Sequence, residues 1–385
     1  MKKTTKLIAR QFTTENELNK FIFSLKHRQS LRIVDEISDQ LSELFFIRNP
    51  HKTVSETSQK EILQFVDVVT QNTSLRLFGY WVYFPWKNIF AHYLPEKLHF
   101  EIRTARNRNL ITSDEQNKYY NSHVGIAGLS VGNSAVGTIL HTGGAKYMRI
   151  ADHDTLAISN LNRIRTSYTN IGLKKTEIAA QEIYEINPFA ELILYPDGLQ
   201  MQTLENFLIM PRPLNVLIEE MDNIFLKIQV RLLARKYKIP VIMAADNGDN
   251  VVLDIERFDL ESNLPLFHGD VSEDELLSIK PDVSKFEAAR MISRWVHLEN
   301  VAIKMQSSLM ELGKTLYSWP QLGNAAFLAG CVLAYSAKKI ILGEEIKSGK
   351  YMISIDALLD PNFNTDREQQ KRKESTKNLK KMLHL

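Results

Sequence analysis

The sequence predicts an α/β protein whose centre is a Rossmann-like, doubly wound and mostly parallel sheet, preceded by an N-terminal α+β extension. Two observations carry this prediction. Between residues 101 and 260, short stretches with strand character alternate with helical stretches, at a spacing that suits right-handed strand–helix–strand crossovers. Two of these stretches, VLIEE at 216–220 and VIMAA at 241–245, are apolar almost throughout, which is typical of strands covered on both faces.

The composition is that of an ordinary globular protein long enough for two or three domains, with 385 residues, 44% hydrophobic and 24% charged. A net charge of +3 is too small to indicate nucleic-acid binding by itself. Neither a signal-length apolar run at the N-terminus nor a membrane-spanning stretch is expected. A single cysteine, Cys331, excludes an intrachain disulfide and a cysteine-rich zinc site, so we expect a reducing, cytoplasmic location.

We expect three regions: residues 1–100, 101–260 and 261–385. In the first, apolar residues at helical spacing predict a helix within 31–46 and another over 59–70. The aromatic stretch LRLFGYWVYFPW, residues 75–86, predicts a strand. It fits either a core strand or an edge strand to which a peptide adds by β-augmentation.

The second region predicts strands and intervening helices in regular alternation. The strands are expected at 123–128, 147–152, 191–195, 215–220, 240–245 and 251–257, and the helices at 132–143, 173–187, 201–209 and 223–237. The third region predicts helices at 273–277, 284–313 and 323–342 and a late strand at 351–356. Its basic tail, 366–385, is expected to be solvated or partner-binding, and Cys331 in its apolar helix to be a buried structural thiol.

A glycine turn follows the first strand of the second region. Gly128 and Gly132, with Ser130 between them, allow a tight turn, and the helix that follows offers its N-terminal N–H groups to a phosphate. Asp152 comes 24 residues after Gly128, at the end of the second strand, where a carboxylate accepts hydrogen bonds from ribose hydroxyls. Alone, this signal also fits a glycine turn without a ligand.

Cationic residues distinguish between two interpretations of this region, a triphosphate-binding site and a dinucleotide-binding site. Arg163 ends the phrase DHDTLAISNLNR, and Lys175 opens the next helix. Asp222 follows the fourth strand, so all three lie at carboxyl ends of strands, where open parallel sheets bind ligands. The two cations exceed what a diphosphate needs, and a carboxylate is a hard ligand for Mg²⁺. These residues therefore predict ATP with Mg²⁺ rather than NAD.

Six ordered motifs resemble those of the E1-like adenylating superfamily, which includes ThiF, MoeB and HesA. They are Arg103-Thr-Ala-Arg106, the Gly128 turn, Asp152-x-Asp154-x5-Asn160-Leu-x-Arg163, Gly172-x-x-Lys175, Ile186-Asn187-Pro188 and Asp222-Asn223. The resemblance implies that a carboxylate attacks the α-phosphate of ATP, which forms an acyl-adenylate and releases pyrophosphate.

The resemblance also implies roles for individual residues. Asp152 would bind the ribose, and the phosphates would be held by the glycine turn (Gly128, Ser130, Gly132) with Asn160, Arg163 and Lys175. Asp154 is a further ATP-binding candidate, and Asp222 would bind Mg²⁺. Arg106 would act as an arginine finger that enters the site of the other subunit, which implies a homodimer.

The chain departs from the family pattern at several points. Its turn reads GLSVGN, with Ser130 where a glycine is usual. The paired C-x-x-C zinc motifs and the catalytic cysteine of many members are absent, so we expect no zinc and an external or intramolecular nucleophile.

A zinc-free, cysteine-poor chain with a 100-residue extension resembles the peptide-maturation branch, which includes the microcin C7 enzyme and the pantocin A enzyme PaaA. This implies a ribosomally made precursor peptide in antibiotic biosynthesis, with a leader clamp in the N-terminal domain. The C-terminus of a ubiquitin-like or sulfur-carrier protein and a tRNA-bound carboxylate stay open as substrates, although nucleic acid is the less favoured partner. A non-catalytic nucleotide-binding scaffold is the alternative outside enzymology.

Overall fold

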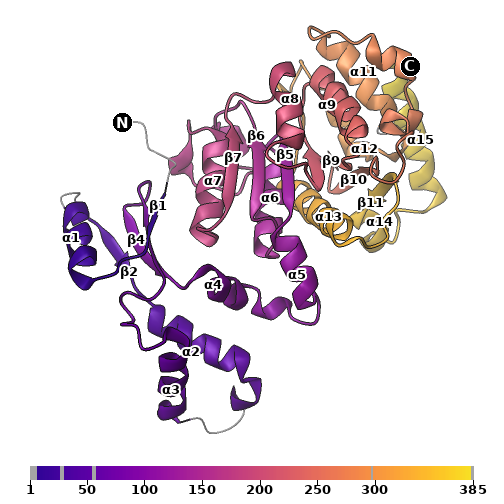
Figure 1. Ribbon diagram of the computed structural model, residues 1–385. Helices are drawn as coiled ribbons and strands as arrows, with labels where there is room; N and C mark the ends of the chain where they lie inside the picture. Colours follow the sequence, from indigo (N-terminus) through magenta and orange to yellow (C-terminus); the bar gives the residue numbers. More distant parts are fainter. Residues whose placement is uncertain (1–6, 27–29, 54–57, 296–297, 383–385) are drawn as a thin grey trace. The chain divides into compact units, whose positions relative to one another are not determined.

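The computed structural model describes residues 7–26, 30–53, 58–295 and 298–382 (Figure 1). The chain divides into two compact units. The first unit comprises Met1–Gln116 with Ala180–Ala190, and the second comprises Asn117–Ala179 with Glu191–Leu385. Helix α7 (Lys175–Ile186) therefore contributes its first residues to the second unit and its remainder to the first.

The first unit contains a four-stranded sheet in the order β1-β3-β4-β2, formed by Ile8–Arg10, Tyr80–Phe84, Ile89–Tyr93 and Arg32–Val34. β3 pairs antiparallel with β1 and β4, whereas β2 pairs parallel with β4. The aromatic stretch thus forms an interior strand, which confirms the core-strand alternative and excludes the edge-strand alternative for these residues. Its side chains are buried on both sheet faces, Trp81 and Tyr83 on one and Val82 and Phe84 on the other.

Helices of the first unit complete two apolar clusters. α1 (Glu15–Lys26) packs Leu18, Ile22 and Leu25 against the sheet. The second cluster joins α2, α3 and α4, which span Ile37–Arg48, Gln59–Thr70 and Glu96–Arg103. Short 3₁₀ turns, η1 and η2, occupy Pro50–Thr53 and Ala105–Asn107. The helix predicted within 31–46 begins only at Ile37, because Arg32–Val34 pairs with β4.

The second unit contains a seven-stranded sheet in the order β11-β10-β9-β8-β5-β6-β7. β7, β6, β5, β8 and β9 run parallel, and β10 and β11 continue the sheet antiparallel. The predicted fold class is therefore confirmed. In chain order β5 to β11 span His123–Ala127, Tyr147–Ala151, Glu191–Tyr195, Val216–Glu219, Val241–Asn247, Asn250–Glu256 and Gly349–Ile353.

The chain reverses its winding direction at β5, which lies between β6 and β8. Right-handed crossovers then place α6 and α7 on one face of the sheet and α8 and α9 on the other (Figure 1). A further helix, α5, precedes β5. In chain order, α5 to α9 span Ser113–Tyr120, Gly132–His141, Lys175–Ile186, Met201–Ile209 and Ile224–Lys236. A reversal of this kind opens a crevice at the carboxyl ends of the strands.

The C-terminal part adds η5 (Leu266–Gly269) and helices to this unit. α10, α11, η6 and α12 span Glu273–Leu277, Lys285–Trp295, Leu298–Asn300 and Ile303–Leu309, and α13, α14 and α15 span Gly323–Leu342, Ile355–Leu359 and Asp366–Met382. The region 284–313, expected as one helix, is thus several short ones. The tail forms the helix α15, which is mostly exposed to solvent and buries only Thr376 and Leu379 beside α12.

α13 packs against α6 and the sheet. Among the described residues it is the one helix long and apolar enough to cross a membrane, and 56% of its most apolar window is buried inside the protein, as in a core helix. Cys331 lies on its exposed side, so the prediction of a buried thiol is wrong. The apolar run indicated burial, but only one side of the helix meets α6 and the sheet.

Candidate functional site

The candidate site lies at the carboxyl rim of the parallel strands of the second unit. Gly128 follows β5, Asp152 follows β6 and Asp222 lies just after β8. In the sheet, β5 lies between β8 and β6. This is the switch point at which open α/β sheets bind ligands. We refer to this edge as the rim.

The glycine turn is built for a close backbone approach. Gly128 has a φ of +93°, and a Cβ at this position would lie 2.3 Å from the carbonyl oxygen of Glu220. Its N–H donates to the carbonyl of Ala151 at 2.8 Å, which ties the turn to β6. A Cβ on Gly132 would stand 3.0 Å from Cγ2 of Ile126, so this glycine brings α6 close to β5.

Asp152 organises the backbone around it. Its carboxylate is buried and accepts the N–H of Leu129 at Oδ2 and that of Asp154 at Oδ1, both at 2.7 Å. One side chain thus fixes the glycine turn and the loop after β6 together. Asp152, His153 and Asp154 also place one ligand atom each within 4.8 Å of one another, the one such group among the described residues.

Lys175 begins α7 and points back to this loop. Its Nζ lies 2.7 Å from Oδ2 of Asp154 and 3.9 Å from Oδ2 of Asp152. The lysine is only 6% exposed, whereas the side chain of Asp154 is half exposed. Burial would raise the pKa of Asp154, but Lys175 outweighs it and lowers this pKa. An ammonium in the first turn of a helix opposes the helix dipole, which these carboxylates compensate.

Asn160 and Arg163 lie on the same loop, around the 3₁₀ turn η3 (Ile158–Asn160). Oδ1 of Asn160 accepts the N–H of Ala157 at 3.0 Å, so this side chain shapes the loop. Arg163 donates from Nε to Oγ of Ser130 at 2.8 Å and from Nη1 to Oδ1 of Asn162 at 3.0 Å. The structure therefore brings Arg163 directly to the glycine turn.

Negative charge faces Arg163 from two other strands. Burial lowers the pKa of the Arg163 guanidinium, and the carboxylates of Asp246 and Asp222 act in the opposite direction. Asp222 is exposed and accepts no hydrogen bond from any described residue, so its oxygens are accessible to a hard cation. Asn223 caps α9 by accepting the N–H of Leu226 at 3.0 Å.

A buried ionic network lies next to the rim and joins β8, α9 and β10. Glu219 pairs with Lys227 at 2.7 Å and with Arg231, whose Nε also lies 2.6 Å from Oε2 of Glu256. Burial alone would raise the pKa of Glu219, but the two cations lower it below its ordinary value. Lys227 and Arg231 are thus held by carboxylates of the core.

Sequence reasoning missed three residues at the rim. Asp246 near the end of β9 faces Arg163, Gln321 donates to Asp246, and Asn162 donates to the carbonyl of Gln321. An acid at the carboxyl end of a predicted strand was the available signal for Asp246, as it was for Asp152. No local pattern marks Gln321, which is remote in sequence from both partners.

Arg106 belongs to a different part of the chain. It lies in η2 of the first unit and is exposed, whereas the other predicted site residues belong to the second unit. Its assignment as an arginine finger stays a prediction.

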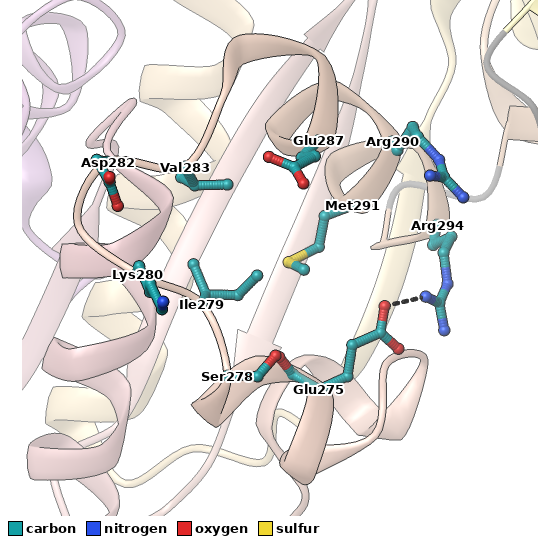
Figure 2. A pocket seen from close by; sticks show the side chains of 10 residues that line it. All are labelled: Glu275, Ser278, Ile279, Lys280, Asp282, Val283, Glu287, Arg290, Met291 and Arg294. Carbon is teal, nitrogen blue, oxygen red and sulfur yellow. Dashed lines mark hydrogen bonds and ion pairs between the residues drawn. The ribbon is translucent and has the colours of Figure 1, made fainter.

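A separate hollow of about 470 Å³ lies between α10, α11 and the loop that joins them (Figure 2). Ile279, Val283 and Met291 supply its apolar wall, and the ion pair between Glu275 and Arg294, at 2.6 Å, closes one side. Among the described residues that line this hollow, none is a site residue predicted from the sequence. The hollow is therefore distinct from the rim.

Comparison with known proteins identifies sequence relatives. The profile of the ThiF family matches residues 104–377. The chain is 32% identical over 283 residues to MT1398, an uncharacterized protein of Mycobacterium tuberculosis (strain CDC 1551 / Oshkosh), and the alignment covers 73% of this chain and 38% of that protein. It is 26% identical over 136 residues to the tRNA threonylcarbamoyladenosine dehydratase of Escherichia coli (strain K12), covering 34% and 49%. The matched part of the chain thus spans less than half the length of each relative.

Solved structures with a similar arrangement include those of PaaA and MccB. The crystal structure of PaaA gives a TM-score of 0.46 at 19% identity and covers 67% of this chain and 77% of that chain. The structure of E. coli MccB with MccA-N7isoASN gives a TM-score of 0.42 at 13% identity, with coverage of 82% and 87%.

Proposed function

The chain belongs to the ThiF family, and we propose that it uses ATP to adenylate a carboxylate, with release of pyrophosphate. The observation that carries this proposal is the convergence of Asp152, Arg163, Lys175 and Asp222 on one rim, around a glycine turn. The turn and the helix N-terminus behind it suit phosphate, and the two cations suit the charge of a triphosphate.

The contacts at the rim support a distinct role for each residue. Asp152 keeps acceptor capacity for ribose hydroxyls, because each of its oxygens accepts only one backbone N–H. Arg163, held by Ser130, neutralises phosphate charge. Lys175 exchanges the half-exposed Asp154 for a phosphate oxygen. Mg²⁺, held by Asp222, would supply further charge neutralisation.

The reaction needs little covalent chemistry from the protein. An oxygen of the substrate carboxylate forms a bond to the α-phosphorus, and the bond from this phosphorus to the bridging oxygen of the β-phosphate breaks. The electron pair leaves with pyrophosphate. Positioning by the rim and neutralisation of the three-phosphate charge are the contributions of this chain.

For the substrate, we propose a ribosomally made precursor peptide in antibiotic biosynthesis, handled in the cytoplasm by a homodimer. The first unit supports a peptide partner because β1 and β2 form the edges of its sheet, and the side chains of Arg32 and Ile33 on β2 are exposed. An extended leader peptide can add a strand at such an edge. After adenylation, an external or intramolecular nucleophile displaces AMP.

A tRNA-bound carboxylate is the second candidate. Similarity to a tRNA threonylcarbamoyladenosine dehydratase favours it, as does the excess of lysine and arginine on α15. The C-terminus of a ubiquitin-like or sulfur-carrier protein is a third class for the same reaction. A non-catalytic scaffold would bind ATP without exchange.

ATP–pyrophosphate exchange tests the proposal. Exchange is expected with the correct acid, whether candidate peptide, carrier protein or tRNA, and Arg163→Ala is expected to abolish it. Arg212→Ala, at an exposed position before β8 and therefore at the opposite edge of the sheet, removes the same charge elsewhere and should keep exchange. Binding of ATP without exchange across all three acid classes would contradict adenylation.

The homodimer is tested by complementation. Arg106→Ala and Lys175→Ala are each expected to lose exchange, and a mixture should recover part of it if the finger enters the site of the other subunit. No recovery in a mixture that forms mixed dimers would place the finger in the same chain or remove it from the mechanism.

A further inference from the structure

Asp246 lies near the carboxyl end of β9, next to β8 in the sheet, and is not among the residues to which the proposed reaction gives a role. Its Oδ2 accepts a hydrogen bond from Nε2 of Gln321 at 3.1 Å. Its Oδ1 is buried and has no hydrogen-bond partner among the residues that the structure describes. A buried carboxylate oxygen without a donor is costly, so a ligand that pairs with it would remove a penalty.

A closed circuit of contacts joins Asp246 to Arg163. Arg163 donates to Asn162, Asn162 donates from Nδ2 to the carbonyl of Gln321 at 2.9 Å, and Gln321 donates to Asp246. The charge interaction between Asp246 and Arg163 closes the circuit. Gly323 allows the segment that contains Gln321 to lie close to the loop that contains Asn162, because a Cβ at Gly323 would lie 2.5 Å from the carbonyl oxygen of Asn162.

The charged surroundings of Asp246 come from two elements. Arg163 faces it from the loop after β6, and Glu220 faces it from the end of β8. Burial raises the pKa of Asp246 to about 6, against the opposing effects of Gln321 and Arg163. Burial also raises the pKa of Glu220 well above its ordinary value, and the charge of Asp246 acts in the same direction.

A triphosphate beside Arg163 changes this balance. The phosphates compete with Asp246 for the guanidinium and bring negative charge to a carboxylate whose Oδ1 has no donor. Uptake of one proton removes the repulsion and turns Oδ1 into an O–H donor. We infer that Asp246 is a further residue of the nucleotide site, which holds Arg163 when the rim is empty and becomes a neutral hydrogen-bond donor when phosphate arrives. This inference rests on the proposed binding of ATP.

Calorimetry with MgATP tests the inference. The Kd of the wild type is expected to rise as the pH increases above about 6, by up to about tenfold per unit, because the pKa of Asp246 is about 6 in the free protein and one proton is taken up on binding. Titrations in two buffers of different ionisation enthalpy count that proton. Asp246→Asn copies the neutral acid, so its Kd should be independent of pH and match that of the wild type at low pH.

The matched control is Asp249→Asn, which removes one charge from the turn between β9 and β10, where Asp249 accepts a hydrogen bond from Asn324. This variant should keep the pH dependence of the wild type. A wild-type Kd independent of pH, or the same dependence in Asp246→Asn, would overturn the role of Asp246. Absence of MgATP binding at every pH would instead overturn the proposed function.

The wild-type proton count stands even if Asp246→Asn does not fold. In that case Gln321→Ala serves as the second variant, because loss of its donor raises the pKa of Asp246 further. The pH dependence should then shift to higher pH, and an unshifted profile would contradict the inference.

Discussion

Arg163 and Ser130 lie in hydrogen-bond contact, with Nε of the arginine 2.8 Å from Oγ of the serine. Ser130 is the residue that departs from the usual glycine pattern of the turn. The departure therefore supplies an acceptor that orients the guanidinium, and it links the loop after β6 to the turn after β5.

Loss of this acceptor should weaken nucleotide binding. A hydrogen bond to a charged group is worth about 1.5–3 kcal/mol, so Ser130→Ala is expected to raise the Kd for MgATP by roughly tenfold or more. Ser159→Ala, an exposed serine on the same loop as Arg163, is the matched control. Calorimetry measures both, and equal affinities in the two variants would contradict the orienting role.

The Lys175 contacts predict a strong effect on stability as well as on exchange. Lys175→Met leaves the buried Asp152 without its cation, which typically costs about 3–5 kcal/mol. Asp154→Asn removes a half-exposed partner and should cost no more than about 1 kcal/mol. Urea denaturation of both variants measures the difference, and equal losses would show that Asp152 does not depend on Lys175.

Gly128→Ala should destabilise the fold through two effects, a positive φ and a collision with the carbonyl of Glu220. Gly172 separates them, because its φ is +84° but nothing lies within 4 Å of an added Cβ. Backbone strain alone costs on the order of 1 kcal/mol in Gly172→Ala, and Gly128→Ala should lose several times more. Equal thermal shifts in the two variants would contradict the close approach at the turn.

Arg231 is expected to matter for folding rather than for nucleotide contact. Arg231→Met leaves Glu219 and Glu256 buried without this cation, at a cost of about 3–5 kcal/mol. Arg235→Met, one turn later on α9, breaks a more exposed pair with Glu273 and should cost no more than about 1 kcal/mol. Chemical denaturation compares them, and a small loss in Arg231→Met would mean that the core tolerates the two acids.

Burial lowers the pKa of His99 in the first unit from 6.5 to about 4, and its Nε2 lies 2.9 Å from the carbonyl of Ile186. The unfolded chain binds the proton more readily between these two values, so stability is full above the unfolded pKa and falls as the pH drops. The loss is on the order of 3 kcal/mol.

His99→Gln keeps a donor without this titration, so its free energy of unfolding should fall less over the same pH range. His153→Gln, at an exposed position, should behave like the wild type. Denaturation curves across the acid range test this, and parallel losses in His99→Gln and the wild type would exclude His99 as the origin.

Periodicity was sufficient for the parallel half of the sheet. The strands β5 to β9 are either covered on both faces or followed by glycine or an acidic residue, so their ends were predicted to within a few residues. The predicted family is confirmed by the match to the ThiF family. β4 was missed because IFAHY is short and lacks alternation. The placement of β3 in the sheet interior depends on β1 and β4 pairing with it, which its own residues do not encode.

The site shows the same division between local and remote information. Gly128, Asp152 and Lys175 were found because a strand end or a helix start marks each of them in the sequence, and Arg163 was found because it ends the motif that follows Asp152. Asp246 and Gln321 meet through tertiary packing alone, since 75 residues separate them. The assignment of Lys227 and Arg231 to the core likewise requires Glu219 and Glu256 to be seen beside them.

The exposed thiol on α13 makes the wild-type chain ready for site-specific labelling. Because Cys331 is the one cysteine in the sequence, a spin label or fluorophore attaches at a single known position without prior mutagenesis. In a two-fold symmetric assembly such labels yield one intermolecular distance, whereas a monomer yields none. That spectrum would report subunit association independently of any substrate.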